Sequence, residues 1–265
     1  MAIGLSAATN DVANTISAYV SNSTVSATGN NIELTATSTS EIEAAAIGGT
    51  LAGAGGAGGG VAVAAAGAGT GNTIANQVLA YVSASSSVTT LGSGSLKLSA
   101  TDNSSIRVIA GALALSGAGG AGGGGAVSLG AAVAVNSIGN HVKAYVDNST
   151  VSSAGAVELS ATESATIDAL AVGGSLAIAG GGGGGGAVAA AGADSRNTIA
   201  NTVWAFVANS SGAKGVSATG GALKLTATDN SHITSDGGGA AAAVGIGGGG
   251  GVGVSVGYSV SINSV

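Results

Sequence analysis

Paired asparagines are the most regular polar feature of this 265-residue sequence. The members of each pair are four residues apart, at Asn10 and Asn14, Asn72 and Asn76, Asn136 and Asn140, and Asn197 and Asn201. A carboxamide both donates and accepts hydrogen bonds, so asparagines in a stacked structure can bond from one layer to the next. We therefore interpret the pairs as structural caps at bends of the backbone. The functional alternative is a surface that binds glycans or ice.

Aromatic residues occupy a second repeated position. Tyr19, Tyr81, Tyr145 and Phe206 each follow the first asparagine of a pair by nine residues. An aromatic ring has a large apolar body that packs well, and an exposed ring can stack on a sugar. Because phenylalanine replaces tyrosine in one repeat, we interpret this position as a packing anchor. A sugar-stacking platform is the functional alternative.

Residue types that carry out catalysis are scarce. Charged residues make up 7% of the chain, which contains two histidines and no cysteine. Acid–base catalysis depends on ionisable groups, and thiolate or imidazole metal sites need several cysteines or histidines. The glycine-rich blocks at 53–60, 117–125, 180–186 and 247–251 lack both the lysine and hydroxyl of a phosphate loop and the regular aspartates of calcium-binding repeats. We predict no enzymatic activity, no catalytic or cofactor-binding residue and no metal site.

Charge and hydropathy patterning restrict the partners. Six basic and twelve acidic residues give a formal net charge of -6, which disfavours binding to nucleic acid. Long uncharged stretches occur, but glycine runs interrupt them, and their apolar residues alternate with period two instead of following a helical period. We predict no membrane span.

Glycine accounts for 51 residues and proline for none. Collagen needs glycine at every third position together with proline, and disordered linkers lack the β-branched residues that are abundant here. Each glycine in regular structure costs about 0.5–1 kcal/mol relative to alanine, because it loses more conformational freedom. A dense, repetitive network of backbone hydrogen bonds offsets this cost, so the composition favours stacked β-structure.

An internal repeat organises the whole chain. Its consensus, N-x-[IV]-[AG]-N-x-[IV]-x-A-[YF]-V, begins at positions 10, 72, 136 and 197, and a fifth copy begins at 263. A second motif keeps step with it and reads IELTAT, LKLSAT, VELSAT and LKLTAT in successive units. We predict a single repeat array over residues 1–265 without a separate catalytic domain, with units at about 10–71, 72–135, 136–196 and 197–262 and partial units at both ends.

The fold class follows from the period-two alternation of side chains within each unit, which predicts strands. The large apolar residues change phase after Asn136, and we interpret the change as a corner or a passage between buried faces. Charges gather in the middle of each unit, while glycine, alanine, valine and leucine fill an uncharged part in which small side chains let sheets approach closely. We predict an all-β, repetitive parallel β-solenoid with tightly packed glycine-rich segments; stacked long β-hairpins are the alternative.

The spacing of the repeated aromatic position distinguishes the possible numbers of rungs per unit. Neighbouring strands in a sheet lie about 4.8 Å apart. Three rungs per unit would therefore separate successive aromatics by about 14 Å, a stacked hairpin by about 10 Å and a single large rung by about 5 Å.

The units resemble repeats of large bacterial surface proteins. N-x-I-x-N-x-V-x-A-Y-V, then S-x-V, then V-x-L-x-A-T-x-x-S-x-I and a Gly/Ala block are similar to repeats of filamentous-haemagglutinin-like and leukotoxin-type filamentous adhesins. The resemblance covers essentially the whole chain. It implies a secreted, extended β-solenoid fibre that acts in adhesion, cell–cell contact or a matrix.

We accordingly expect a structural segment of an extracellular bacterial fibre or adhesin stalk, located outside the cell or on its surface, with the signal peptide not included in this fragment. Expected partners are further copies of the chain, through glycine-rich dry faces or open ends, and cell-surface glycans. The alternative function is an ice- or polysaccharide-binding module. The alternating Thr35, Thr37 and Thr39 favour it, but the other units keep that pattern only in part.

Overall fold

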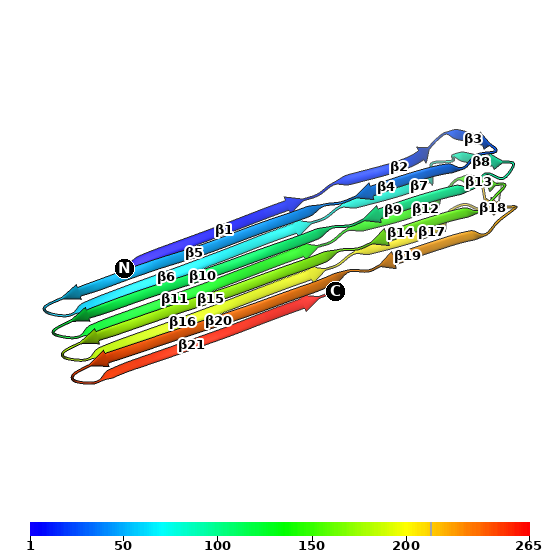
Figure 1. Cartoon of the computed structure of the whole chain (residues 1–265). Helices are drawn as coiled ribbons and strands as arrows, with labels where there is room; N and C mark the ends of the chain where they lie inside the picture. Colours follow the sequence, from blue (N-terminus) through cyan, green and yellow to red (C-terminus); the bar gives the residue numbers. More distant parts are fainter. Residues whose placement is uncertain (213) are drawn as a thin grey trace.

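Parallel β-strands build the whole structure (Figure 1). The computed structural model describes residues 1–212 and 214–265 and contains, within them, 21 strands and no helix. Each strand pairs in parallel with the equivalent strands of neighbouring repeats, which gives one five-stranded and four four-stranded sheets. The predicted parallel β-solenoid is confirmed.

Two sheets of long strands form the glycine-rich half, which we call the blade. The outgoing blade sheet consists, in spatial order, of β1 (Ala2–Val12), β6 (Gly60–Ile74), β11 (Gly124–Ile138), β16 (Gly185–Ile199) and β21 (Gly251–Ser264). The returning blade sheet consists of β5 (Glu41–Gly56), β10 (Ser105–Gly120), β15 (Thr166–Gly181) and β20 (His232–Gly247). The two sheets lie face to face and enclose a core of their own.

Three sheets of shorter strands form the other half, which we call the head. The outgoing head sheet contains β2 (Thr15–Ser21), β7 (Gln77–Ser83), β12 (His141–Asp147) and β17 (Thr202–Ala208). The end sheet contains β3 (Thr24–Thr28), β8 (Ser87–Leu91), β13 (Thr150–Ser153) and β18 (Val216–Ala218). The returning head sheet contains β4 (Ile32–Ser38), β9 (Leu96–Asp102), β14 (Val157–Glu163) and β19 (Leu223–Asp229).

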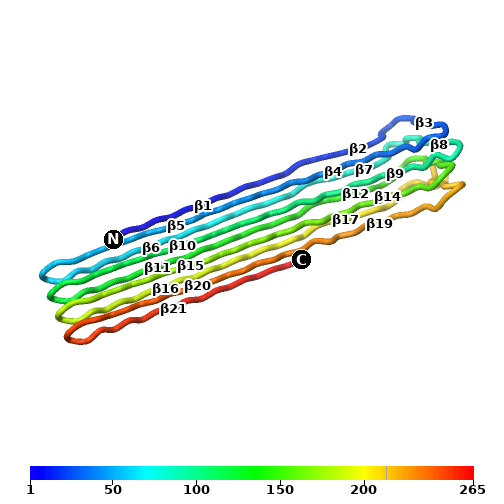
Figure 2. Tube along the Cα trace, viewed as in Figure 1, coloured from blue at the N-terminus to red at the C-terminus, as the bar shows by residue number. Residues whose placement is uncertain are grey.

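One repeat length forms one rung. From Gly60 the chain runs out along β6 and β7, crosses at β8 and returns along β9 and β10, and the next rung lies directly beside it (Figure 2). Asn136 pairs with Asn72 on one side and with Asn197 on the other. Ring centroids at the aromatic position are 5.1, 4.9 and 5.0 Å apart, which matches a single rung and rejects the spacings expected for three rungs or a stacked hairpin.

Inward and outward side chains keep one phase as the chain passes from the outgoing blade sheet into the outgoing head sheet. Asn136, Ile138 and Val142 are all buried, so the chain does not change its facing after Asn136. Instead, the large apolar residues change sides: Val133 and Val135 point outward in the blade, whereas Ile138 and Val142 point inward toward and within the head. The interpretation of the phase change as a corner or a new buried face is therefore wrong.

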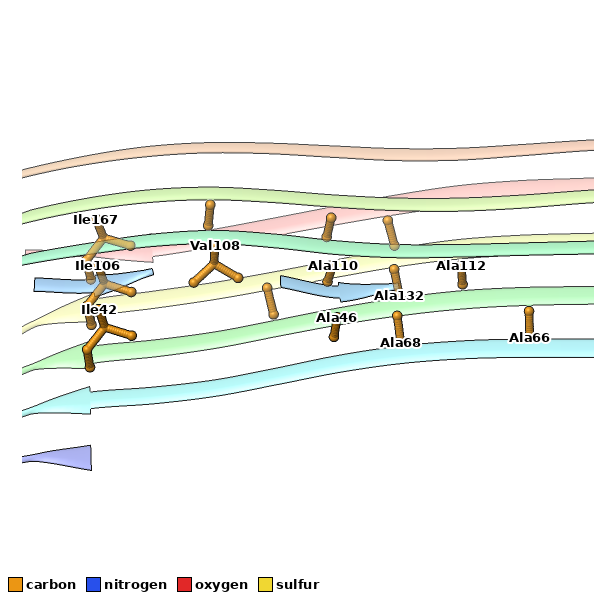
Figure 3. Close-up of a cluster of buried hydrophobic side chains, with 14 of the residues drawn as sticks. Ile42, Ala46, Ala66, Ala68, Ile106, Val108, Ala110, Ala112, Ala132 and Ile167 are labelled. Atoms are coloured by element: carbon orange, nitrogen blue, oxygen red, sulfur yellow. The ribbon is translucent and has the colours of Figure 1, made fainter. Parts of the chain in front are cut away.

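The two halves have cores of different side-chain size. Valine and leucine fill the head, with Val78, Leu98 and Val142 fully buried. In the blade the core begins with isoleucines at the head boundary and continues with alanines, as Figure 3 shows for Ile42, Ile106 and Ile167 and for Ala46, Ala66, Ala68, Ala110, Ala112 and Ala132. The smaller core makes the blade thin.

Glycines bring the two blade sheets into direct backbone contact. A Cβ atom at Gly173 would lie 2.1 Å from the carbonyl oxygen of Gly192, and a Cβ atom at Gly130 would lie 2.1 Å from that of Gly174. Real Cβ atoms do not approach an oxygen so closely, so only glycine fits at these positions. The expected close approach of small-residue faces is confirmed, and it occurs inside each chain.

A glycine also closes each turn at the tip of the blade. Gly59, Gly123, Gly184 and Gly250 occupy equivalent places, with φ angles of 105°, 119°, 126° and 112°. L-residues with a side chain rarely adopt this conformation. Tip turns therefore need glycine for their backbone angle, whereas the inner blade positions need it for space.

Candidate functional site: internal ladders and exposed faces

The first asparagine of each pair belongs to a continuous side-chain ladder. Nδ2 of each residue donates to Oδ1 of the next, at 2.8 Å from Asn10 to Asn72, 2.9 Å from Asn72 to Asn136 and 2.8 Å from Asn136 to Asn197. A further bond of 2.9 Å leads to Asn263. Asn72, Asn136 and Asn197 are buried, so these carboxamides hold rungs together and are not accessible to a ligand.

The second asparagine of each pair caps the break between blade and head strands. Oδ1 of Asn76, Asn140 and Asn201 accepts a bond from the backbone N–H of the equivalent residue one rung earlier, at 3.1, 2.8 and 2.9 Å. For Asn76 the donor is Asn14. Strand pairing pauses here, and the side chains satisfy backbone groups that would otherwise lack a partner. This placement agrees with a capping role at irregular backbone.

Asn140 also anchors a buried polar cluster that sequence reasoning missed. Its Nδ2 lies 2.9 Å from Asp102 Oδ1, 3.1 Å from Ser104 Oγ and 3.2 Å from Glu163 Oε1. Asp102 and Glu163 are adjacent in register and have no exposed surface. The alternation of side chains could have revealed them. Asp102 shares the inward face of its strand with Leu98, and Glu163 shares that of its strand with Leu159.

Burial raises the pKa of Glu163 from 4.5 to about 8, and the neighbouring Asp102 carboxylate contributes in the same direction. The hydrogen bond from Asn140 opposes the increase, and Asp229 adds a weaker repulsion. Two carboxyl groups that share a proton can serve as an acid–base pair in enzymes. Here both are sealed inside the head, where no substrate can reach them, so their effect is on stability.

The raised pKa predicts that the protein loses stability as pH rises from the acidic range to slightly above neutral. The folded state keeps a proton on Glu163 that the unfolded state loses, so the free energy of unfolding falls as pH rises from about 4.5 to about 8, by at most about 1.4 kcal/mol per pH unit, and changes little above that range. Glu163→Gln should remove this loss because the amide keeps the hydrogen-bonding geometry without charge. Chemical denaturation at pH 5 to 9 measures the effect.

The exposed Glu158 on the same strand offers a matched control. Glu158→Gln should keep the pH dependence of the wild-type chain. Identical profiles for the wild-type chain and Glu163→Gln would show that this carboxyl group does not titrate as described.

The repeated aromatic residues form a parallel stack on the outside of the outgoing head sheet. The interplanar angles are 7° between Tyr19 and Tyr81 and 2° for the next two pairs, which end at Tyr145 and Phe206. Neighbouring rings cover each other's faces, and a sugar needs an open face for stacking. Burial, together with the neighbouring Tyr81 and Asp147, raises the pKa of Tyr145. The arrangement favours packing over sugar binding.

Hydroxyl side chains form two columns on the outer face of the returning head sheet. The first column is Thr35, Ser99, Ser160 and Thr226, and the second is Thr37, Thr101, Thr162 and Thr228. Rungs about 4.8 Å apart, and positions about 6.6 Å apart along each strand, define a flat grid. Of the three alternating threonines, Thr35 and Thr37 begin regular hydroxyl columns, whereas Thr39 follows the end of β4 and belongs to neither column.

Asn22, Asn148 and Asn209 begin N-x-[ST] sequences, and their φ angles of 48°, 46° and 51° place them in turns. Two expectations concern metal ions and the membrane. Over residues 1–212 and 214–265, no group of three or more histidine, cysteine or acidic side chains is arranged to hold a metal ion. The same residues include no helix that is long and apolar enough to cross a membrane.

Comparison with known proteins assigns no relative to this chain: no protein-family model, curated protein or solved structure matches it.

Proposed function

We propose that this chain is a structural segment of an extracellular bacterial fibre or adhesin stalk. The main support is that equivalent strands pair in register from rung to rung. Asparagine and aromatic columns continue across these rungs. Strand pairing joins each rung to its immediate neighbours, so additional repeats lengthen the structure without altering its cross-section. Such a design suits mechanical spacing.

The buried polar groups support the same role. Asn76, Asn140, Asp102 and Glu163 bond within the stack, where they fix the register of rungs instead of facing a substrate. The resemblance to filamentous adhesins supports the extracellular location and a part in adhesion, cell–cell contact or a biofilm matrix. Cell-surface glycans are the proposed target of such a fibre.

Self-association through open sheet edges extends the proposal. Edge strands present unpaired backbone groups that can template another chain. Negative-stain electron microscopy of the purified chain should show filaments of uniform width, roughly 80 Å, set by the length of one arm of a rung. Isolated plates at all concentrations would contradict assembly through the edges.

The hydroxyl grid favours one second candidate, an ice- or polysaccharide-binding module. Thr101 and Thr162 lie in register on the exposed face of the returning head sheet. Thermal hysteresis and glycan-array binding that disappear in Thr162→Lys would favour this candidate over a purely structural role. Ser152→Lys, on the exposed face of the end sheet, is the matched control.

A further inference from the structure

Large aliphatic side chains cover the outside of the returning blade sheet. Leu113 is 53% exposed and Val172 is 43% exposed, although both belong to central strands of that sheet. We call this surface the aliphatic face, and it comprises Ile47, Leu51, Ile109, Leu113, Leu115, Leu170, Val172, Leu176 and Ile178. The small side chains of the same strands point inward, so the blade exposes large aliphatic side chains, which most proteins bury.

The aliphatic face is continuous because large side chains cover neighbouring glycines. A Cβ atom at Gly174 would lie 3.0 Å from Leu113 Cδ1, and one at Gly111 would lie 3.9 Å from Ile47 Cγ1. Large residues and glycines alternate between rungs at the levels of Gly111 and Leu113, and Leu51, Leu115 and Leu176 lie side by side in register. The result is one apolar surface and not a set of isolated residues.

Charges border this surface at its head end. Glu41, Glu43, Arg107 and Asp168 lie there, and Arg107 Nη1 is 3.1 Å from Glu43 Oε1. Asp236 on the edge strand β20 lies beside Leu170. The other end is the glycine turn of the tip. An apolar centre with a polar border is the usual anatomy of a protein interface.

The outside of the outgoing blade sheet is less continuous. Its β6 strand contributes Ala65, Gly67 and Gly69, and its β16 strand places an ion pair between Asp194 and Arg196 at 2.9 Å within the surface. Closing this side against an apolar partner would bury charge, which is costly. On the returning sheet, Asp236 lies on the edge strand β20, whereas Asp194 and Arg196 lie on β16, which has neighbours on both sides. The aliphatic face is therefore the better interface of the two.

We propose that a second copy of this chain packs its aliphatic face against that of the first, as in a β-sandwich. The fourth strand of the sheet, β20, extends this face with the exposed Val244 and Ile246. Four strands about 4.8 Å apart and about 12 residues of about 3.3 Å each give an area on the order of 800 Å² per copy. A stable protein interface buries about this area on each partner. The small-residue faces are already used inside the blade, so the association expected through glycine-rich faces is assigned here to the aliphatic one.

This lateral pairing depends on the proposed structural role of the chain. Its test is independent of filament growth. At concentrations below those at which filaments grow, sedimentation velocity of the full chain should give a species of twice the 23.9 kDa chain mass. Leu113→Lys should shift it to the monomer. The matched control is Leu129→Lys on the outgoing sheet, where Leu129 is 45% exposed on a central strand; it should leave the dimer intact. Circular dichroism should show unchanged β-structure in both.

Three results would overturn the pairing: a wild-type monomer at all concentrations, a Leu113→Lys protein that associates like the wild type, or equal loss of association in both variants. Flotation with phosphatidylcholine vesicles tests lipid as the occupant. Wild-type flotation that Leu113→Lys abolishes would replace the second copy with a lipid surface. Filaments that Leu113→Lys still forms at higher concentration would retain the proposed edge assembly while separating it from lateral pairing.

Discussion

Gly173→Ala should destabilise the fold by about 3 kcal/mol or more. The added methyl carbon would lie 2.1 Å from the carbonyl oxygen of Gly192, 2.8 Å from its carbonyl carbon and 3.0 Å from its nitrogen. All three are backbone atoms of the facing sheet, so no side chain can rotate away. Relief requires the two blade sheets to separate, which disturbs packing across neighbouring rungs. Chemical denaturation followed by circular dichroism measures the loss.

Gly186→Ala is the matched control, because Gly186 lies on the facing strand and a Cβ atom there meets nothing within 4 Å. This substitution should be neutral or should stabilise by up to about 1 kcal/mol, since alanine restricts the unfolded chain more than glycine does. Equal midpoints for the two variants would show that the blade sheets are not in backbone contact.

Asn140→Ala should cost about 3–5 kcal/mol. It removes the donor shared by Asp102 and Glu163 and the acceptor of the Asn76 backbone N–H, all within a region closed to water. A buried polar group left without a partner costs more than the bond that it made. The free energy of unfolding at pH 7 measures this loss.

Two further substitutions separate the causes. Asn201→Ala, in the partly buried equivalent position, should cost only about 1 kcal/mol because its carboxamide bonds Asn140 N–H and Ser231 and touches no buried carboxyl pair. Asn140→Asp keeps the shape but adds a third acid, so its deficit should shrink as pH falls and the carboxyl groups become protonated. A similar loss for Asn140→Ala and Asn201→Ala would contradict the role assigned to the cluster.

Much of the architecture could be predicted because the repeat constrains every unit alike. The period-two alternation predicted strands, and the equal spacing of Asn72, Asn136 and Asn197 predicted a stack in which equivalent residues meet. The spacing of the aromatic position would tell the number of rungs per repeat, but only the structure gives the distances between the rings. The buried Asp102–Glu163 pair was not predicted, since these residues lie 61 positions apart and only rung stacking makes them neighbours.

The repeat and its alternation were therefore sufficient to establish a solenoid of equivalent units with asparagine and aromatic columns. They were not sufficient to say which face of a blade strand lies inside. Hydropathy separates inside from outside only when one set of side chains is polar, and in the blade both sets are apolar. Tertiary structure resolved this: glycine and alanine lie inside, where the two backbones come into contact. Beyond the buried isoleucines at the head boundary, the large aliphatic side chains must therefore lie outside.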